Sequence, residues 1–280
     1  MAPSGGCGCI NPKEDGSMDT DCNCIHMPYS DGASFAGFVN KEIPVPGMPG
    51  KTITMRGIKN LDGVIDFMMA HGGDKATEFV VTGGSAGGLS TFLHADRFGA
   101  ALKAGAKDIK TIRAAPVVGY FLDHDNFAHT GGGKPNTPGW SKPGAPTAQN
   151  YTLWMKYVYG MQVRRVITSG KNFHAAATDR RLELQLVVAD VPCSLSFAQN
   201  MTFGADGGLT EACQTKHPTE PWLCFMSPRM QDVIETPFFM FNSKYDAWQL
   251  GNEFQSNWAT KAEQAGVLQY GKDFMAQLAP

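Results

Sequence analysis

The chain lacks the features that mark membrane-spanning and nucleic-acid-binding proteins. No apolar run approaches the roughly 20 residues of a membrane-spanning helix, so we expect no membrane span. The formal net charge is only −2, from 24 basic and 26 acidic residues, which disfavours nucleic acid or an anionic membrane as the main partner. The first residues have neither a charged start nor an apolar stretch, so no signal peptide is visible.

The remaining composition is that of a globular protein with one large core. The 280 residues are 42% hydrophobic and 18% charged, which suits one large α/β core or two smaller ones. Because apolar runs alternate with helical patterns, we predict a single α/β domain over 1–280 with a mostly parallel sheet flanked by helices. Strands are expected at 24–29, 52–55, 78–82, 111–120 and 237–242, and helices at 60–70, from 89 to 98, at 148–160 and at 252–266.

Four of the seven cysteines lie in an irregular head, residues 1–24. Cys7 with Cys9 and Cys22 with Cys24 form two C-x-C pairs. Zinc is one interpretation, but structural zinc sites usually space their ligands C-x₂₋₄-C. Disulfides formed in an oxidising compartment fit the spacing better, and no metal site is predicted.

Two further cysteines bracket a short polar loop near the C-terminal third. Cys213 and Cys224 are placed to form a disulfide across this loop, which leaves Cys193 without an obvious partner. This cysteine usage points to a secreted or extracellular protein.

The most informative motif surrounds Ser85. A β-branched run leads into this serine, Gly83 and Gly87 flank it, and a helical pattern begins at Leu89. This order of strand, tight turn and helix is the setting of a G-x-S-x-G nucleophile elbow, with glycines that avoid collisions between strand and helix. Ser85 is therefore the candidate nucleophile for acyl transfer.

Other glycine-rich turns bind phosphate, and two such patterns are absent here. A Walker loop requires G-K-[ST], and the dinucleotide fingerprint requires G-x-G-x-x-G. Residues 83–88 match neither pattern. A purely structural or anion-binding turn remains the alternative to a nucleophile elbow.

An activated serine requires a base held by an acid, and the acid has a clear candidate. In α/β hydrolases the chain order is Ser, then Asp or Glu, then His. Asp246 follows the apolar run 237–242, so it is the candidate acid; the other interpretation is a helix N-cap.

The base has no candidate in that order, because none of the seven histidines follows Asp246. His124 and His129 lie in an Asp-rich loop and could serve as surrogate bases or be ordinary loop histidines. His94 lies nine residues after Ser85 on the expected helix, so we do not expect it to reach the hydroxyl.

Several motifs together resemble the pectin acetylesterase/Notum family of carboxylesterases. The matching segments are Tyr29-Ser30-Asp31-Gly32-Ala33-Ser34-Phe35, Ser85-Ala86-Gly87-Gly88-Leu89, Phe121-Leu122-Asp123 and Tyr245-Asp246-Ala247-Trp248-Gln249. The resemblance implies an α/β-hydrolase fold, Ser85 as nucleophile, Asp246 as triad acid and the backbone N–H of Ala86 as an oxyanion donor. It implies no cofactor.

The resemblance also has departures. The family's E-G-G-G-W-C oxyanion motif and its C-terminal histidine are absent, so the chain resembles a member cut at both ends. Residues 163–199 interrupt the family spacing and contain two Arg-Arg pairs. We interpret them as an insert or as a retained intron in the gene.

The resemblance implies a monomeric serine carboxylesterase that removes acetyl groups from polysaccharide or acyl groups from protein through a Ser-His-Asp mechanism. The alternative is an inactive member that binds a glycan or a protein, because the triad histidine is missing from these residues.

Overall fold

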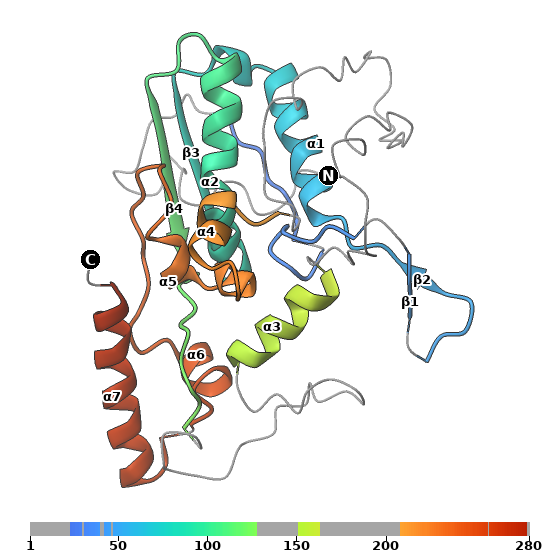
Figure 1. Ribbon diagram of the computed structural model, residues 1–280. Helices are drawn as coiled ribbons and strands as arrows, with labels where there is room; N and C mark the ends of the chain where they lie inside the picture. The colour runs from blue at the N-terminus through green and yellow to red at the C-terminus, as the bar shows by residue number, and fades with distance from the viewer. Residues whose placement is uncertain are drawn as a thin grey trace, which may run out of the picture.

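The computed structural model describes residues 23–29, 31–39, 42–45, 47–127, 151–162, 208–256 and 258–278. Most of the Cys-rich head, His129 and the segment 163–199 lie outside these residues. A parallel sheet forms the centre of the described part. Strand β3 (Glu78–Gly84) pairs with β4 (Thr111–Val117) over its full length (Figure 1).

A third parallel segment extends this sheet on the other side of β4. Phe238 and Phe241 form parallel bridges to Ala114 and Val117. The amide of Phe241 donates to the carbonyl oxygen of Pro116 at 3.0 Å. Because Gly84 also pairs with Val117, the carboxyl ends of all three segments lie level with one another. The expected parallel sheet is therefore confirmed in the described residues.

Helix α2 (Ala86–Gly105) packs along β3 and β4, and α1 (Gly57–Ala70) packs against α2 (Figure 1). Helix α2 buries most of its residues because the sheet lies on one side of it and loops and helices cover the other. Helix α1 buries Gly57 at its start and the stripe of Ile58, Leu61, Ile65 and Met68, which is the pattern of an amphipathic surface helix.

The remaining elements surround this centre. They are β1 (Ile43–Pro44), β2 (Thr52–Ile53), η1 (Gly73–Lys75), α3 (Tyr151–Gln162), α4 (Glu211–Lys216), η4 (Pro221–Phe225), α5 (Ser227–Met230), α6 (Ala247–Asn252) and α7 (Lys261–Leu278). The largest apolar core joins α2, α3, η4 and α7, with Phe92, Tyr120 and Phe225 at its centre.

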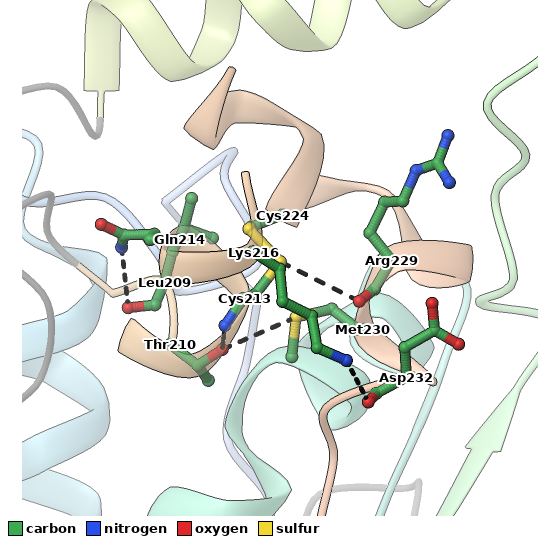
Figure 2. The surroundings of a disulfide bond; sticks show 9 residues. All are labelled: Leu209, Thr210, Cys213, Gln214, Lys216, Cys224, Arg229, Met230 and Asp232. Atoms are coloured by element: carbon green, nitrogen blue, oxygen red, sulfur yellow. Dashed lines mark hydrogen bonds between the residues drawn. A yellow bond between two sulfur atoms is a disulfide. The ribbon is translucent and has the colours of Figure 1, made fainter. Parts of the chain in front are cut away.

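The expected disulfide between Cys213 and Cys224 is confirmed, and it joins α4 to η4 (Figure 2). The surrounding contacts hold the same short elements together: Lys216 Nζ donates to the carbonyl oxygen of Asp232 at 2.9 Å. Thr210 caps α4 by accepting the N–H of Cys213. Cys24 is disulfide-bonded as well, in line with disulfides rather than zinc in the head.

Helix α1 begins at Gly57, three residues before the expected start of this helix at residue 60. The reason is tertiary: the N–H of Ile58 donates to the carbonyl oxygen of Gly37 at 3.1 Å, and the Asp31 carboxylate lies against Gly57. A carboxylate at a helix N-terminus is favourable because the N–H groups there point outward.

Two expected elements are wrong. Residues 24–29 form no strand, since Pro28 has no N–H to donate and no described strand pairs with this segment. The expected helix at 252–266 is in fact two helices, because α6 ends at Asn252 and α7 begins at Lys261. Thr260 starts α7 through a capping box with Glu263: the Thr260 N–H donates to Oε2 at 2.8 Å and the Glu263 N–H donates to Oγ1 at 3.1 Å.

The apolar segment 237–242 is less buried than its sequence predicts. Phe239 is 76% exposed and Phe241 is 67% exposed, although Phe238 stacks edge-on against Phe92 of α2. Val80 on β3 is also exposed. The described helices therefore cover one face of the sheet at these positions and leave the other open.

Candidate active site

Ser85 occupies a strained turn between β3 and α2. Its backbone has φ +56° and ψ −118°, a left-handed region that a non-glycine residue adopts only under tertiary constraint. Two backbone hydrogen bonds hold it there: its N–H donates to Val117 O, and its carbonyl oxygen accepts the N–H of Leu89, each at 3.0 Å. The residue is exposed. The sequence predicts a nucleophile elbow here, and this is the geometry that an elbow requires.

The glycines around Ser85 permit close backbone contact. A Cβ on Gly83 would lie 2.5 Å from the carbonyl oxygen of Gly87. A Cβ on Gly88 would lie 2.5 Å from Val117 O and 2.8 Å from the Cα of Gly119, whereas one on Gly87 would meet nothing within 4 Å. Sequence reasoning singled out Gly83 and Gly87 and missed Gly88, because the crossing strand that crowds it is far away in sequence.

Asp246 lies at the same edge of the sheet as Ser85. Ser85 directly follows Gly84, which is level with Phe241, and Asp246 comes five residues after Phe241. Its Oδ1 accepts the N–H of Gln249 at 3.0 Å, so Asp246 is the N-cap of α6. The cap and the triad acid are compatible roles, because the capping bond fixes the orientation of the carboxylate.

Ala86 is the first residue of α2, directly after Ser85. The first N–H groups of a helix have no acceptor within the helix, and the helix dipole is positive there. The N–H of Ala86 is therefore suited to an oxyanion. Ser34 lies beside it, since its Oγ donates to Ala86 O at 3.0 Å.

A tight turn at 31–35 brings Ser34 to the elbow. Asp31 Oδ1 accepts the N–H groups of Ala33 and Phe35, each at 3.1 Å. Ser34 and Phe35 both have positive φ, at +49° and +60°. Without the contacts made by Asp31, this consecutive pair of left-handed residues would be unfavourable.

His94 holds this turn against α2. Its Nε2 lies 2.8 Å from the backbone carbonyl oxygen of Ser34, and because a carbonyl only accepts, Nε2 carries the hydrogen. His94 is 1% exposed, and burial lowers its pKa to about 3. The expectation that His94 does not serve Ser85 agrees with these contacts, but the sequence did not indicate its structural role.

His124 is engaged away from the elbow. Its Nε2 lies 3.1 Å from Asp273 Oδ2 on α7, and its ring packs edge-on against Tyr270 and Phe254. Within the described part of the chain, no hydrogen bond or ion pair joins a histidine to Ser85 or Asp246. The base therefore has no assignment among these residues.

The described residues hold no group of three or more His, Cys, Asp or Glu side chains that could bind a metal ion. No described helix is both long enough and apolar enough to cross a membrane.

Comparison with known proteins finds one family. The pectinacetylesterase family model matches residues 8–133 and 157–272. Pectin acetylesterase 11 of Arabidopsis thaliana is 24% identical over 230 residues, which is 82% of this chain and 41% of that protein. The palmitoleoyl-protein carboxylesterase NOTUM of Drosophila melanogaster is 23% identical over 173 residues, which is 62% of this chain and 17% of that protein. This chain therefore spans less than half the length of these relatives.

The fold has solved counterparts. The Wnt deacylase Notum from Drosophila, in its crystal form II, superposes with a TM-score of 0.59 at 20% sequence identity. The match covers 90% of this chain and 55% of that one.

Proposed function

Because the chain belongs to the pectinacetylesterase family, whose relatives include carboxylesterases with the α/β-hydrolase fold, we propose that it hydrolyses carboxylic esters through Ser85. The observation that carries the proposal is the backbone of Ser85, held at φ +56° at the carboxyl end of β3. This turn lies between the end of β3 and Ala86, the first residue of α2, and Asp246 caps α6 five residues after Phe241, which is level with the end of β3.

The reaction would follow the order of serine esterases. Ser85 Oγ attacks the ester carbonyl, a base removes its proton, and the N–H of Ala86 stabilises the oxyanion. Asp246 would orient and stabilise the protonated base. Water then hydrolyses the acyl-enzyme and releases the acid. The base in this scheme is a histidine, which follows the acid in α/β hydrolases.

The proposed substrate is an O-acetyl ester of polysaccharide, or else an acyl ester of a protein. The names of the relatives support both classes: pectin acetylesterase for the first and palmitoleoyl-protein carboxylesterase for the second. We further propose a monomeric, secreted protein. The Cys213–Cys224 disulfide supports secretion, since such bonds persist in oxidising compartments.

One observation favours a second candidate, an inactive binding module. Each histidine whose hydrogen bonds are described binds another partner, and none of them is joined to Ser85 or Asp246 by a hydrogen bond or an ion pair. In this alternative the chain keeps the fold and binds a glycan or a protein without cleaving it.

Labelling with a fluorophosphonate probe separates the two candidates, because the probe reacts only with an activated serine. The esterase proposal predicts labelling of the wild-type protein when a histidine after Asp246 is present, only weak labelling of residues 1–280 alone, and none of Ser85→Ala. Ser90→Ala is the control, since Ser90 is a buried serine of α2, the helix that follows Ser85, and it should label like the wild type. Absence of labelling in the folded wild type would favour the binding module, and labelling that survives Ser85→Ala would contradict the assignment of Ser85.

A further inference from the structure

A buried polar cluster lies next to Asp246, to which it is joined by a hydrogen bond from Gln249, and the proposed reaction does not use it. It consists of Gln249 of α6, Glu253 directly after that helix, and Tyr270 of α7; we call it the Gln249–Glu253–Tyr270 cluster. Gln249 and Glu253 are each 1% exposed and Tyr270 is 0% exposed. An acidic side chain this deeply buried is rare unless a partner neutralises it.

No basic partner for Glu253 is found in the described part of the chain. The lysine, arginine and histidine side chains that form ion pairs there do so with other carboxylates and not with Glu253. The titratable groups that face the cluster are Asp246 at the start of α6, Tyr151 of α3 and Tyr270 of α7. His124, after β4, approaches only the Tyr270 ring, with centroids 5.0 Å apart.

With Glu253 ionised, the contacts of the Tyr270 hydroxyl require one more hydrogen than the cluster supplies. The Tyr270 hydroxyl lies 2.9 Å from Glu253 Oε2 and 3.2 Å from Gln249 Oε1. Gln249 Nε2 donates to the carbonyl oxygen of Tyr120 at 2.8 Å, so the amide presents its oxygen to Tyr270. A phenol has one hydrogen. With Glu253 ionised, two acceptors would compete for that hydrogen and one buried contact would have none.

We propose that Glu253 is held as the neutral carboxylic acid: its proton is donated to the Tyr270 oxygen, and the Tyr270 hydroxyl donates to Gln249 Oε1. Every short contact in the cluster then has one hydrogen. Burial is the main cause that raises the pKa of Glu253 well above its usual range; hydrogen bonds from Tyr270 and from the Leu122 backbone lower it by less, and the nearby Asp246 charge raises it further.

The cluster also positions Asp246. The N–H of Gln249 donates to Asp246 Oδ1, and the side chain of the same Gln249 is fixed by Tyr120 and Tyr270. Glu253 is thus a positioning residue for Asp246, acting through Tyr270 and Gln249. This second part rests on the proposed function of Asp246 as triad acid, whereas the protonation of Glu253 does not.

Infrared difference spectroscopy at pH 7 tests the protonation directly. Subtracting the spectrum of Glu253→Gln from that of the wild-type chain should reveal a protonated carboxyl band. The control is Glu220→Gln, at an exposed glutamate, whose difference should reveal carboxylate bands instead. Carboxylate bands in the Glu253→Gln difference would overturn the proposal.

The pH dependence of unfolding gives a second test that does not depend on how stable the variant is. The unfolded chain ionises Glu253 above its usual pKa and the folded chain does not, so the wild type loses stability as pH rises. From pH 5 to 7 the ratio of the wild-type to the Glu253→Gln unfolding constant should rise about tenfold per pH unit. A ratio that stays constant with pH would contradict a neutral Glu253.

The positioning role has its own readout. Tyr270→Phe breaks the link to Gln249 and should slow fluorophosphonate labelling of Ser85, whereas Glu253→Gln still donates to Tyr270 and should keep the wild-type rate. Equal rates in Tyr270→Phe and the wild type would contradict the positioning role. If the wild type does not label at all, the proposed function fails while the infrared result still decides the protonation.

Discussion

At the scale of single residues, His94 shows that a buried histidine on the helix that follows Ser85 can serve structure alone. Its Nε2–H donates to the carbonyl oxygen of Ser34, and Ser34 in turn holds Ala86. The chain of contacts runs from α2 through the 31–35 turn to the proposed oxyanion donor. The side chain keeps that turn against the elbow without touching Ser85.

Replacing His94 by phenylalanine should keep the ring volume and remove the donor. The carbonyl oxygen of Ser34 then stays buried without a hydrogen, which costs about 1–3 kcal/mol of unfolding free energy. Chemical denaturation at pH 7 measures this loss. We also expect slower probe labelling of Ser85, because the turn beside Ala86 loosens.

The pH dependence of the same variant is a sharper test. Because burial lowers the folded pKa of His94 to about 3, the unfolded chain binds a proton first as pH falls below about 6.5. The wild type therefore loses about 1.4 kcal/mol per pH unit from this group between about pH 6.5 and 3, and His94→Phe should not. His71→Phe, at an exposed histidine, is the control and should keep the wild-type slope. An unchanged acid slope in His94→Phe would show that His94 is not buried neutral.

At the scale of elements, the crossing of β4 and α2 at the elbow explains why two adjacent glycines differ. A Cβ on Gly88 would meet the carbonyl oxygen of Val117, the last residue of β4, and the backbone of Gly119, which follows β4. Gly87 faces open space. The helix approaches the strand so closely at this point that the sheet, not the local turn, requires the glycine.

The pair Gly88→Ala and Gly87→Ala tests this crossing. Gly88→Ala forces a Cβ into backbone atoms and should lower the unfolding free energy by about 1–3 kcal/mol or more. Gly87→Ala should stay within about 0.5 kcal/mol of the wild type, or be slightly more stable, because alanine favours a helix. Thermal or denaturant unfolding of both variants decides the matter, and similar losses in the two would contradict this close approach of helix and strand.

The element boundaries show which local signals suffice. The strand before Ser85 and the helix after it follow from β-branched and helical patterns, and both are confirmed. The gap between α6 and α7 was missed although the Thr260–Glu263 capping box is visible in the sequence. That local signal could have placed the start of α7 correctly.

At the scale of the whole molecule, a direct measurement can decide whether residues 163–199 are an insert or a retained intron. We propose that they are a retained intron or an insert between Gln162, which anchors Phe38 through its carbonyl oxygen, and Asn200. A retained intron predicts that the protein from its natural source yields a tryptic peptide joining Gln162 to Asn200. Mass spectrometry that instead finds the peptide Asn172–Arg180 would rule out the intron and support a true insert.

The two buried titratable groups also act together at this scale. Acidification below about pH 6.5 removes stability through His94, whereas Glu253 adds stability as pH falls toward its usual range. The two effects on stability oppose one another between about pH 6.5 and the usual pKa range of a glutamate. The stability of the wild type alone therefore hides both groups, and the comparison of each variant with the wild type separates them.

The strand and helix on either side of Ser85, the Cys213–Cys224 disulfide and the family could be predicted from the sequence, because each is encoded by neighbouring residues or by short motifs, whereas the catalytic roles of Ser85 and Asp246 stay predictions. The roles of His94 and Glu253, the need for glycine at position 88 and the exposure of Phe239 became apparent only from the folded chain. The physical reason is that burial, hydrogen count and close backbone approach depend on segments that are distant in the chain. Local patterns specify the turn that carries Ser85, and packing between elements specifies what surrounds it.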